Sequence, residues 1–224
     1  MNDRRKWDTC TPAIRVPPLP IEVSPTPQYD NASTAWEGCA DSLSPYSRER
    51  MNDDWKSEFE KVWDRGIAAW KAGRRSAKTM FEPKDVVFLA TIGCTAQELF
   101  DFVDDFLDYD DFDFETVLAV AAIRREYFLN VMHGKSTGRV VQMEELPAKS
   151  ARVDGIAWLP RLIAKARLKL RGEMNPDLMF GCAGDRPFLR ERGMTLPQFL
   201  ELVRDSADDD RPIIEAVKKS AARR

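Results

Sequence analysis

The chain repeats itself at an offset of 100 residues, and this internal repeat constrains the fold more than any local propensity does. When residues 85–117 are laid on residues 185–217 without a gap, eleven of the 33 positions are identical. Unrelated segments of this length would share about two identities, so the match predicts a duplicated supersecondary unit. The identical pairs are Asp85/Asp185, Phe88/Phe188, Leu89/Leu189, Gly93/Gly193, Thr95/Thr195, Val103/Val203, Asp105/Asp205, Asp108/Asp208, Asp110/Asp210, Glu115/Glu215 and Val117/Val217.

Apolar residues recur at helical spacing in both copies. From Asn52 onward they lie three, four or seven positions apart as far as Trp70, and a second stripe runs from Leu159 to Leu170. This spacing indicates helices with one buried face. Residues 117–123 are apolar on nearly every side, so we expect a long helix over about residues 113–132 in the middle of the core.

Helix start and stop signals also occur in pairs. Gly73 and Gly172 follow the two stripes, and glycine is the usual residue just past a helix end. Capping boxes are expected at Thr95 to Glu98 and at Thr195 to Gln198, where a threonine accepts from a backbone N–H and the glutamate or glutamine reaches back. We also expect Asp85 and Asp185 to cap short helices.

These signals predict an all-α protein made of two tandem helical bundles, with about four helices in each and a pseudo-twofold relation between them. The expected domains are a Pro-rich extended or disordered arm over residues 1–50, a first repeat over 51–133, a linker over 134–153 and a second repeat over 154–224. Segment 140–143, the one candidate strand, is interpreted as a loop.

Composition limits the possible partners. The net charge is −3 and charged residues make up 32% of the chain, which argues against nucleic acid as the main partner. No apolar stretch approaches the length of a membrane span, and the first residues lack the apolar core of a secretory signal. The four cysteines are scattered without metal-ligand spacing, so we expect a cytoplasmic protein with reduced thiols; they are Cys10, Cys39, Cys94 and Cys182.

A family resemblance rests on the second repeat. Residues 155–167 read GIAWLPRLIAKAR, and they are followed by Gly172, Gly181-Cys182, Asp185 and further motif residues up to Thr195. Residues 154–217 thereby resemble the bacterial domain of unknown function 5069. Residues 53–132 look like a diverged copy of the same unit. The resemblance implies a helical fold and marks the second repeat as the less altered copy, but it implies no reaction.

The second repeat also holds the most concentrated set of polar groups. Arg161 and Lys165 are four residues apart and share one face of a helix beside Trp158, with Arg167 further along. Two cations beside an aromatic ring can clamp a carboxylate or phosphate. A solvated basic helix that pairs with acidic neighbours is the alternative.

Three residues on the turn that follows complete this candidate site. Cys182, flanked by glycines, is a candidate reactive thiol, with a buried structural thiol as the alternative. Asp185 is the candidate catalytic carboxylate, and Arg186 a further ligand-binding cation. No metal is expected among these residues, and the sequence identifies no cofactor.

An acidic run lies in the first repeat. Asp104, Asp105 and Asp108 follow the DDxxD pattern that holds Mg²⁺ in class I isoprenoid synthases, and carboxylates are the ligands that Mg²⁺ prefers. The second metal-binding motif of those enzymes is absent from the sequence. A solvated helix end and acidic loop is the alternative.

The sequence therefore leaves three hypotheses open. The first is a small soluble enzyme or metabolite-binding protein with an anionic-ligand site in or next to the second repeat. The second is a helical protein–protein interaction module that uses the acidic run or the Pro-rich arm. The third is a Mg²⁺-dependent diphosphate enzyme. We favour the first, with a small anionic metabolite as the partner; the oligomeric state is open.

Overall fold

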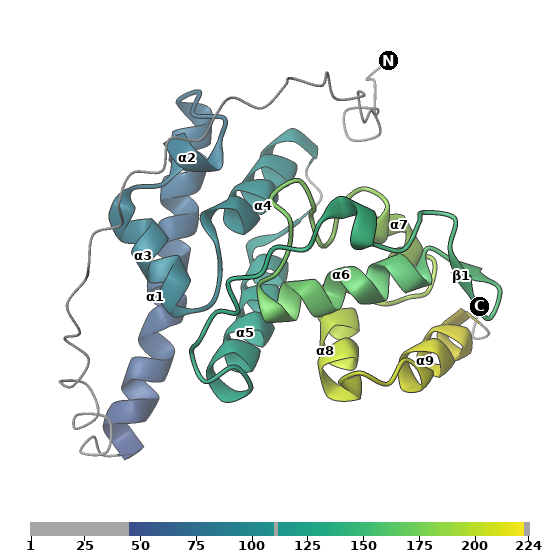
Figure 1. The fold of residues 1–224 in the computed structure, drawn as a ribbon. Coiled ribbons are helices and arrows are strands. Elements are labelled where there is room, and N and C mark those ends of the chain that lie inside the picture. Colours follow the sequence, from purple (N-terminus) through teal and green to yellow (C-terminus); the bar gives the residue numbers. More distant parts are fainter. Residues whose placement is uncertain (1–44, 110–111, 222–224) are drawn as a thin grey trace, which may run out of the picture. The chain divides into compact units, whose positions relative to one another are not determined.

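A computed structural model describes residues 45–109 and 112–221 of the 224-residue chain. Within these ranges the regular structure is nine α-helices, one turn of 3-10 helix and one two-stranded hairpin, so the expected all-α class is confirmed (Figure 1). The predicted Pro-rich arm falls mainly on residues 1–44, which lie outside the described residues.

The first half of the described chain contains five helices, α1 Pro45–Lys71, α2 Ala77–Met80, α3 Pro83–Thr91, α4 Ala96–Tyr109 and α5 Phe114–Asn130. Helix α1 begins seven residues before the expected start at Asn52. Proline is favoured in the first turn of a helix, and the polar segment after Pro45 has no apolar period that would mark the boundary. The helix ends just before Gly73, whose φ is +86°.

The second half contains a 3-10 turn at Met143–Glu145, strands β1 Arg152–Val153 and β2 Ile156–Ala157, and helices α6 Leu159–Arg171, α7 Asp185–Arg190, α8 Leu196–Ser206 and α9 Arg211–Ala221. The strands pair antiparallel across Asp154 and Gly155, which both have positive φ. That is the backbone of a tight hairpin turn. The hairpin was not predicted, because two-residue strands carry no measurable alternation.

Side chains cap the helices as the sequence indicates at most positions. Thr95 Oγ1 accepts from Glu98 N at 3.2 Å, and Thr195 Oγ1 accepts from Gln198 N at 3.3 Å. In both boxes the third helical residue returns a bond to the threonine N–H, at 2.9 Å. The two predicted capping boxes are therefore confirmed.

Asp85 does not cap α3, contrary to the prediction. Pro83 starts the helix, so Glu82 is the N-cap residue and Asp85 is the third helical residue, where its Oδ2 accepts from Glu82 N at 3.1 Å. Asp185 is likewise not an N-cap residue, because α7 begins at Asp185 itself and the preceding Gly184 is the cap. Both carboxylates are turned inward and are buried.

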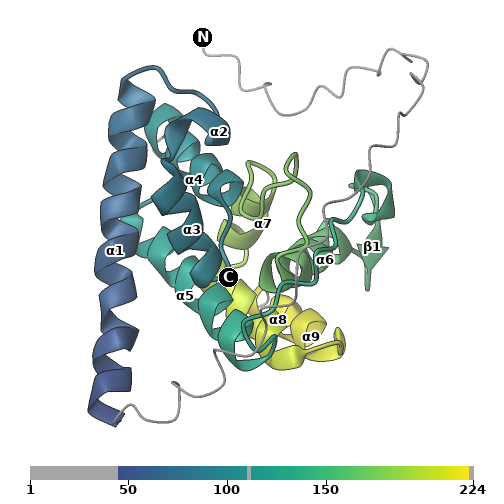
Figure 2. The ribbon, with the colours of Figure 1, turned by 60° about the vertical axis from the view of Figure 1, so that its left-hand side comes forward.

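The described residues from Asp53 onward form one compact unit in which α5 has a central place. In Figures 1 and 2, α5 runs between α1 on one side and α6 and α8 on the other, and it packs on both of the latter helices. On the α1 side, the ring of Phe114 lies 6.3 Å from that of Phe59 and 5.9 Å from that of Trp63. One apolar core therefore joins elements from both halves of the sequence.

No single helix in the described part of the chain is both long and apolar enough to cross a membrane. The pair α3 and α4 reaches the necessary length and composition only in combination, across a bend of 104°.

Candidate functional site

The side chains of Trp158, Lys165, Cys182 and Asp185 come together where α6 faces the turn before α7. Lys165 lies two turns into α6, and its side chain is buried against the start of α7. The ring of Trp158 lies on the turn because residue 184 is glycine, where a Cβ atom would overlap the indole. The described structure thus brings together four of the seven residues that the sequence indicated for this site.

Asp185 is the centre of the cluster and has a partner on each side. Its carboxylate forms a short ion pair with Lys165 through Oδ2, which also accepts from Gly181 N at 2.9 Å. Its Oδ1 accepts from Trp158 Nε1 at 2.9 Å. Asp185 is 0% exposed and Lys165 is 1% exposed. A buried pair of this kind is stable only when the remaining lone pairs also find donors, which they do here.

Cys182 joins the cluster through its sulfur. Lys165 Nζ lies 3.1 Å from Cys182 Sγ while it also holds Asp185. Cys182 is half-buried, in contrast to the buried ion pair beneath it. The ammonium therefore contacts both a buried carboxylate and the sulfur of a half-buried thiol.

Arg186 connects this turn to the first half of the chain. Its Nη1 donates to Gly181 O at 2.9 Å and to Asp105 Oδ2 on α4 at 2.6 Å. Its guanidinium also lies 5.2 Å from the ring centre of Phe112. The expected ligand-binding cation is thus engaged with an aspartate of the predicted acidic run, a pairing that the sequence did not reveal.

Arg161 and Arg167 have other partners than the cluster. Arg161 Nη1 donates to Pro147 O at 2.8 Å, and the guanidinium of Arg167 donates to Ala207 O and pairs with Asp210 at 2.7 Å. Arg161 and Lys165 therefore have different hydrogen-bond partners in this structure.

The aspartates of the acidic run point to different partners. Asp104 Oδ1 accepts from Trp70 Nε1 at 2.8 Å, Asp105 pairs with Arg186, and Asp108 is exposed. Asp104 and Asp105 are adjacent on the helix and face different directions, and each is held by a different partner, so the three carboxylates do not converge. Among the described residues there is no group of three or more His, Cys, Asp or Glu side chains able to hold a metal ion.

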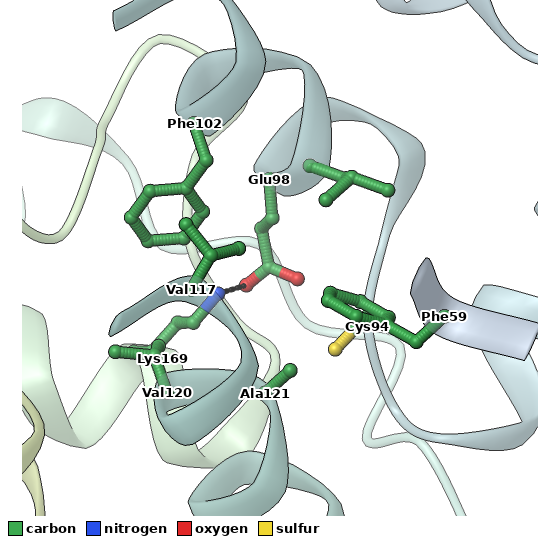
Figure 3. A pocket seen from close by; sticks show the side chains of 9 residues that line it. Phe59, Cys94, Glu98, Phe102, Val117, Val120, Ala121 and Lys169 are labelled. Atoms are coloured by element: carbon green, nitrogen blue, oxygen red, sulfur yellow. Dashed lines mark ion pairs between the residues drawn. The ribbon is translucent and has the colours of Figure 1, made fainter. Parts of the chain in front are cut away.

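A second polar cluster, which the sequence did not indicate, lies in a small pocket between α4, α5 and α6 (Figure 3). Lys169 Nζ points into it and pairs with Glu98 Oε1 at 3.0 Å. Cys94 lines the same pocket, together with apolar residues from α1, α4 and α5. Glu98 was identified only as a capping residue, since its pairing with α6 depends on the tertiary fold.

Burial shifts two pKa values near this pocket. Desolvation raises the pKa of the Cys94 thiol to about 11, and the Glu98 carboxylate adds to the shift, against smaller opposing effects of Lys169 and Arg124. Desolvation also raises the pKa of Asp101, one turn along α4 from Glu98, to about 7. Cys94 is therefore a protonated, inert thiol at neutral pH.

Comparison with known proteins finds a family match for the segment that contains Trp158, Lys165, Cys182 and Asp185. Residues 144–224 match the model of a family described as a domain of unknown function, DUF5069. The resemblance predicted for residues 154–217 is thereby confirmed, and the match includes all four residues of the Asp185 cluster. No curated protein and no solved structure matches the chain.

Proposed function

We propose that this protein is a small enzyme or metabolite-binding protein that acts through Cys182 on a ligand with a negatively charged group, at a site on the second repeat. The observation that carries the proposal is the double contact of Lys165, whose ammonium touches both the buried Asp185 and the half-buried Cys182 sulfur. Cytoplasmic location is part of the proposal, because a reducing compartment keeps such a thiol free.

The proposed chemistry follows from the contacts that link Asp185, Lys165 and Cys182 in that order. Asp185 holds Lys165 in one position, since the aspartate is itself held by Trp158 and Gly181. A fixed ammonium beside sulfur favours the thiolate, which is the nucleophilic form of cysteine. Cys182 is thus the nucleophile of the proposed site, and Lys165 and Asp185 position and activate it.

Arg161 is the proposed contact for the negative group of the ligand. It lies one turn before Lys165, is half-buried, and uses one of its five N–H donors on Pro147 O. Trp158, three residues earlier on the same side, is the proposed wall against which the body of the ligand packs.

Paired alkylating reagents test both parts of this proposal. Iodoacetate is anionic and iodoacetamide is neutral, and peptide mapping can follow their reaction at Cys182 and Cys94 separately. We expect Cys182 to react about tenfold faster than a small free thiol at pH 7, and to prefer iodoacetate more than that thiol does. Cys94 should stay unmodified in the folded protein because it is buried.

Two variants separate activation from binding. Lys165→Met should slow both reagents at Cys182, whereas Arg161→Ala should remove only the preference for iodoacetate. The proposal is wrong if Cys182 in the folded wild-type protein reacts no faster than the free thiol and shows no preference between the reagents.

A helical interaction module is the alternative function, and one observation favours it. Val86 and Val87 on α3 are 43% and 66% exposed, which is unusual for two neighbouring large apolar residues. If a protein partner covers them, Val87→Glu abolishes complex formation in light scattering but leaves the reactivity of Cys182 unchanged. The Mg²⁺-dependent diphosphate hypothesis gains no support from the separate contacts of Asp104 and Asp105.

We also propose that the two halves descend from one duplicated unit. Backbone bonds 100 positions apart support this, since Cys94 N donates to Leu89 O at 2.9 Å and Met194 N donates to Leu189 O at 3.0 Å. An ion pair recurs at the same offset, as Arg65 pairs with Asp85 where Lys165 pairs with Asp185.

The proposed pseudo-twofold relation has less support than the duplication. Helix α5 packs across onto α6 and α8, whereas α9, at the equivalent place in the second half, packs on its neighbour α8. An experimental structure in which α3 to α5 superpose on α7 to α9 would establish the duplication, and unrelated paths would disprove it.

A further inference from the structure

The amine nitrogen of Lys165 and the sulfur of Cys182 are held in contact by two different segments of the chain. Lys165 Nζ lies 3.1 Å from Cys182 Sγ. Lys165 is in the middle of α6, where the helical bonds fix its backbone. The backbone of Cys182 is fixed as well, because its carbonyl oxygen accepts from Asp185 N at 2.8 Å and from Arg186 N at 3.2 Å. The contact is therefore a property of the folded state, since 17 residues separate the two partners in the sequence.

The two partners differ in their exposure to solvent. Lys165 is 1% exposed, whereas Cys182 is half-buried. A small peroxide can therefore reach the sulfur, while the amine is closed to reagents in solution. Peroxide converts a thiol to a sulfenic acid, whose sulfur is electrophilic and condenses with a neighbouring thiol or nitrogen. The nitrogen that contacts this sulfur is that of Lys165.

An amine must lose a proton before it attacks sulfur, and Asp185 lies where it can accept that proton. Its Oδ2 forms the short ion pair with Lys165 Nζ, and Asp185 is 0% exposed. Transfer of one proton along this contact gives a neutral amine and a neutral carboxylic acid, and burial favours neutral groups over charged ones. Cys182, Lys165 and Asp185 thus supply an electrophile, a nucleophile and a base in one contact chain.

We propose that Cys182 is a site of reversible oxidative modification, at which hydrogen peroxide joins its sulfur to the Lys165 amine as a sulfenamide. In the first step the thiol takes one oxygen from the peroxide: the O–O bond breaks, an S–O bond forms and water leaves. In the second step Nζ, after giving one proton to Asp185, attacks Sγ. The S–O bond breaks, and the oxygen leaves with a further amine proton as a second water molecule. The sulfur is oxidised by two electrons, and the peroxide is reduced to water.

The modification would switch off the site in an oxidising environment. It removes the nucleophilic sulfur and the charge of Lys165 together. Two molecules of a small thiol reverse it, since they cleave the S–N bond, return the Cys182 thiol and the amine, and become a disulfide. The inference shares the reactive Cys182 with the function proposed above, but it needs neither Arg161 nor a ligand.

Peptide mapping of the full-length wild-type protein tests the crosslink. The protein is treated with hydrogen peroxide at pH 7 and digested without a reductant. Cleavage after Glu173 places Lys165 and Cys182 on separate peptides. A sulfenamide should appear as a linked pair of these peptides that is lighter than their sum by about 2 Da. Dithiothreitol, added before digestion, should restore the two separate peptides.

Cys94 and Lys169 are the internal control, because this cysteine and this lysine also line one pocket. Cys94 is buried and its pKa is raised to about 11, so it should stay a thiol and no peptide should join it to Lys169. Cys182→Ser should lose the linked pair. Lys165→Arg keeps a cation but has no nucleophilic amine, so its Cys182 should stop at a sulfenic acid that dimedone labels. The wild-type mass measurement stands even if that variant does not fold.

The possible results separate the crosslink from the proposed function. If dimedone labels Cys182 in the wild-type protein but no linked pair forms, the crosslink is overturned and the reactive thiol remains. A linked pair from a Cys182 that alkylates no faster than a free thiol would support the crosslink alone. A disulfide from Cys182 to another cysteine, direct oxidation to sulfinic acid, or a linked pair that retains an oxygen atom would each overturn the condensation with Lys165.

Discussion

The ion pairs Arg65–Asp85 and Lys165–Asp185 occupy positions 100 residues apart and differ in their access to water. Both aspartates are buried, and each also accepts a backbone N–H, that of Glu82 in one case and that of Gly181 in the other. The side chain of Arg65 is 33% exposed, whereas that of Lys165 is 2% exposed. The same local turn can therefore hold either an ordinary half-solvated salt bridge or a buried charge pair next to a thiol.

The two cations, Arg65 and Lys165, also differ in their second contact. Arg65 also pairs with Glu58 at 3.1 Å, so a second carboxylate and water share its charge. Lys165 contacts the Cys182 sulfur, and position 82, the equivalent of Cys182, is an exposed glutamate. Of these two regions, only the second combines a sequestered cation with a neighbouring thiol, which is why we place the proposed chemistry there.

The largest expected effect comes from removing the two aspartates in turn. Asp185→Ala leaves Lys165 buried and unpaired, so the free energy of unfolding should fall by about 3–5 kcal/mol. Asp85→Ala leaves Arg65 half-solvated and still paired with Glu58, so the loss should be about 1–2 kcal/mol. Urea unfolding of both variants measures the gap. Equal losses would show that the two pairs are energetically equivalent.

The free energy of unfolding should depend on pH through Asp101 on α4. Because burial raises its pKa from 3.8 to about 7, the folded state holds the proton more tightly than the unfolded state does. The free energy of unfolding should therefore fall as pH rises from about 4 to about 7. At pH 8, Asp101→Asn should be more stable than wild type by about 2 kcal/mol, after allowance for its partial exposure.

Glu201 is the matched control for Asp101, since it lies at the equivalent position and is exposed. Glu201→Gln should unfold with the wild-type dependence on pH. An Asp101→Asn variant whose advantage at pH 8 persists unchanged at pH 4 would argue against titration of this carboxyl group.

The glycines that follow α1 and α6 should differ in how much an alanine substitution destabilises the fold. Gly73 and Gly172 both have positive φ, which costs an alanine about 1–2 kcal/mol. At Gly73 an added Cβ meets nothing within 4 Å, but at Gly172 it meets the guanidinium of Arg124. Gly172→Ala should therefore lower the free energy of unfolding by about 1–2 kcal/mol more than Gly73→Ala. Equal costs would mean that Arg124 moves aside freely.

The smallest difference is expected at the capping boxes. Thr95→Ala and Thr195→Ala should each cost about 1 kcal/mol, because the two boxes have the same bonds and both threonines are exposed. Thermal unfolding of the two variants measures this. A cost at one box only would reveal a difference that the hydrogen bonds do not show.

Local features of the fold were predictable from the sequence because they depend on neighbouring residues. The threonine boxes, the glycine stops and the start of α5 after Asp113, which accepts from Thr116 N at 2.8 Å, follow from short-range hydrogen bonds. The errors are also local. Asp85 was assigned as a cap because the preference of Pro83 for the first turn was not weighed against it.

The composition of the site was predictable only in part. The sequence placed Lys165 and Asp185 together, since both belong to one dense stretch. The sequence placed Lys165 and Arg161 on one ligand because the two share a helix face. In the structure the partner of Lys165 is Asp185, on a turn 20 residues further along the chain. Lys169 and Glu98 pair across 71 residues, and no helical period or motif reports a contact of that kind.

Among the described residues, three ion pairs cross between the halves, and two of them have a consequence for the segment that matches the family model. Arg186 depends on Asp105, and Lys169 on Glu98, yet both bases lie inside the family segment 144–224 and both acids lie outside it. A gene fragment cut at the edge of the family would encode cations stripped of their counterions and an α6 without its α5 neighbour. The segment that matches the family model is therefore held in place by charges that lie outside it. A substitution of Glu98 or Asp105 in α4 should therefore destabilise residues that lie within 144–224.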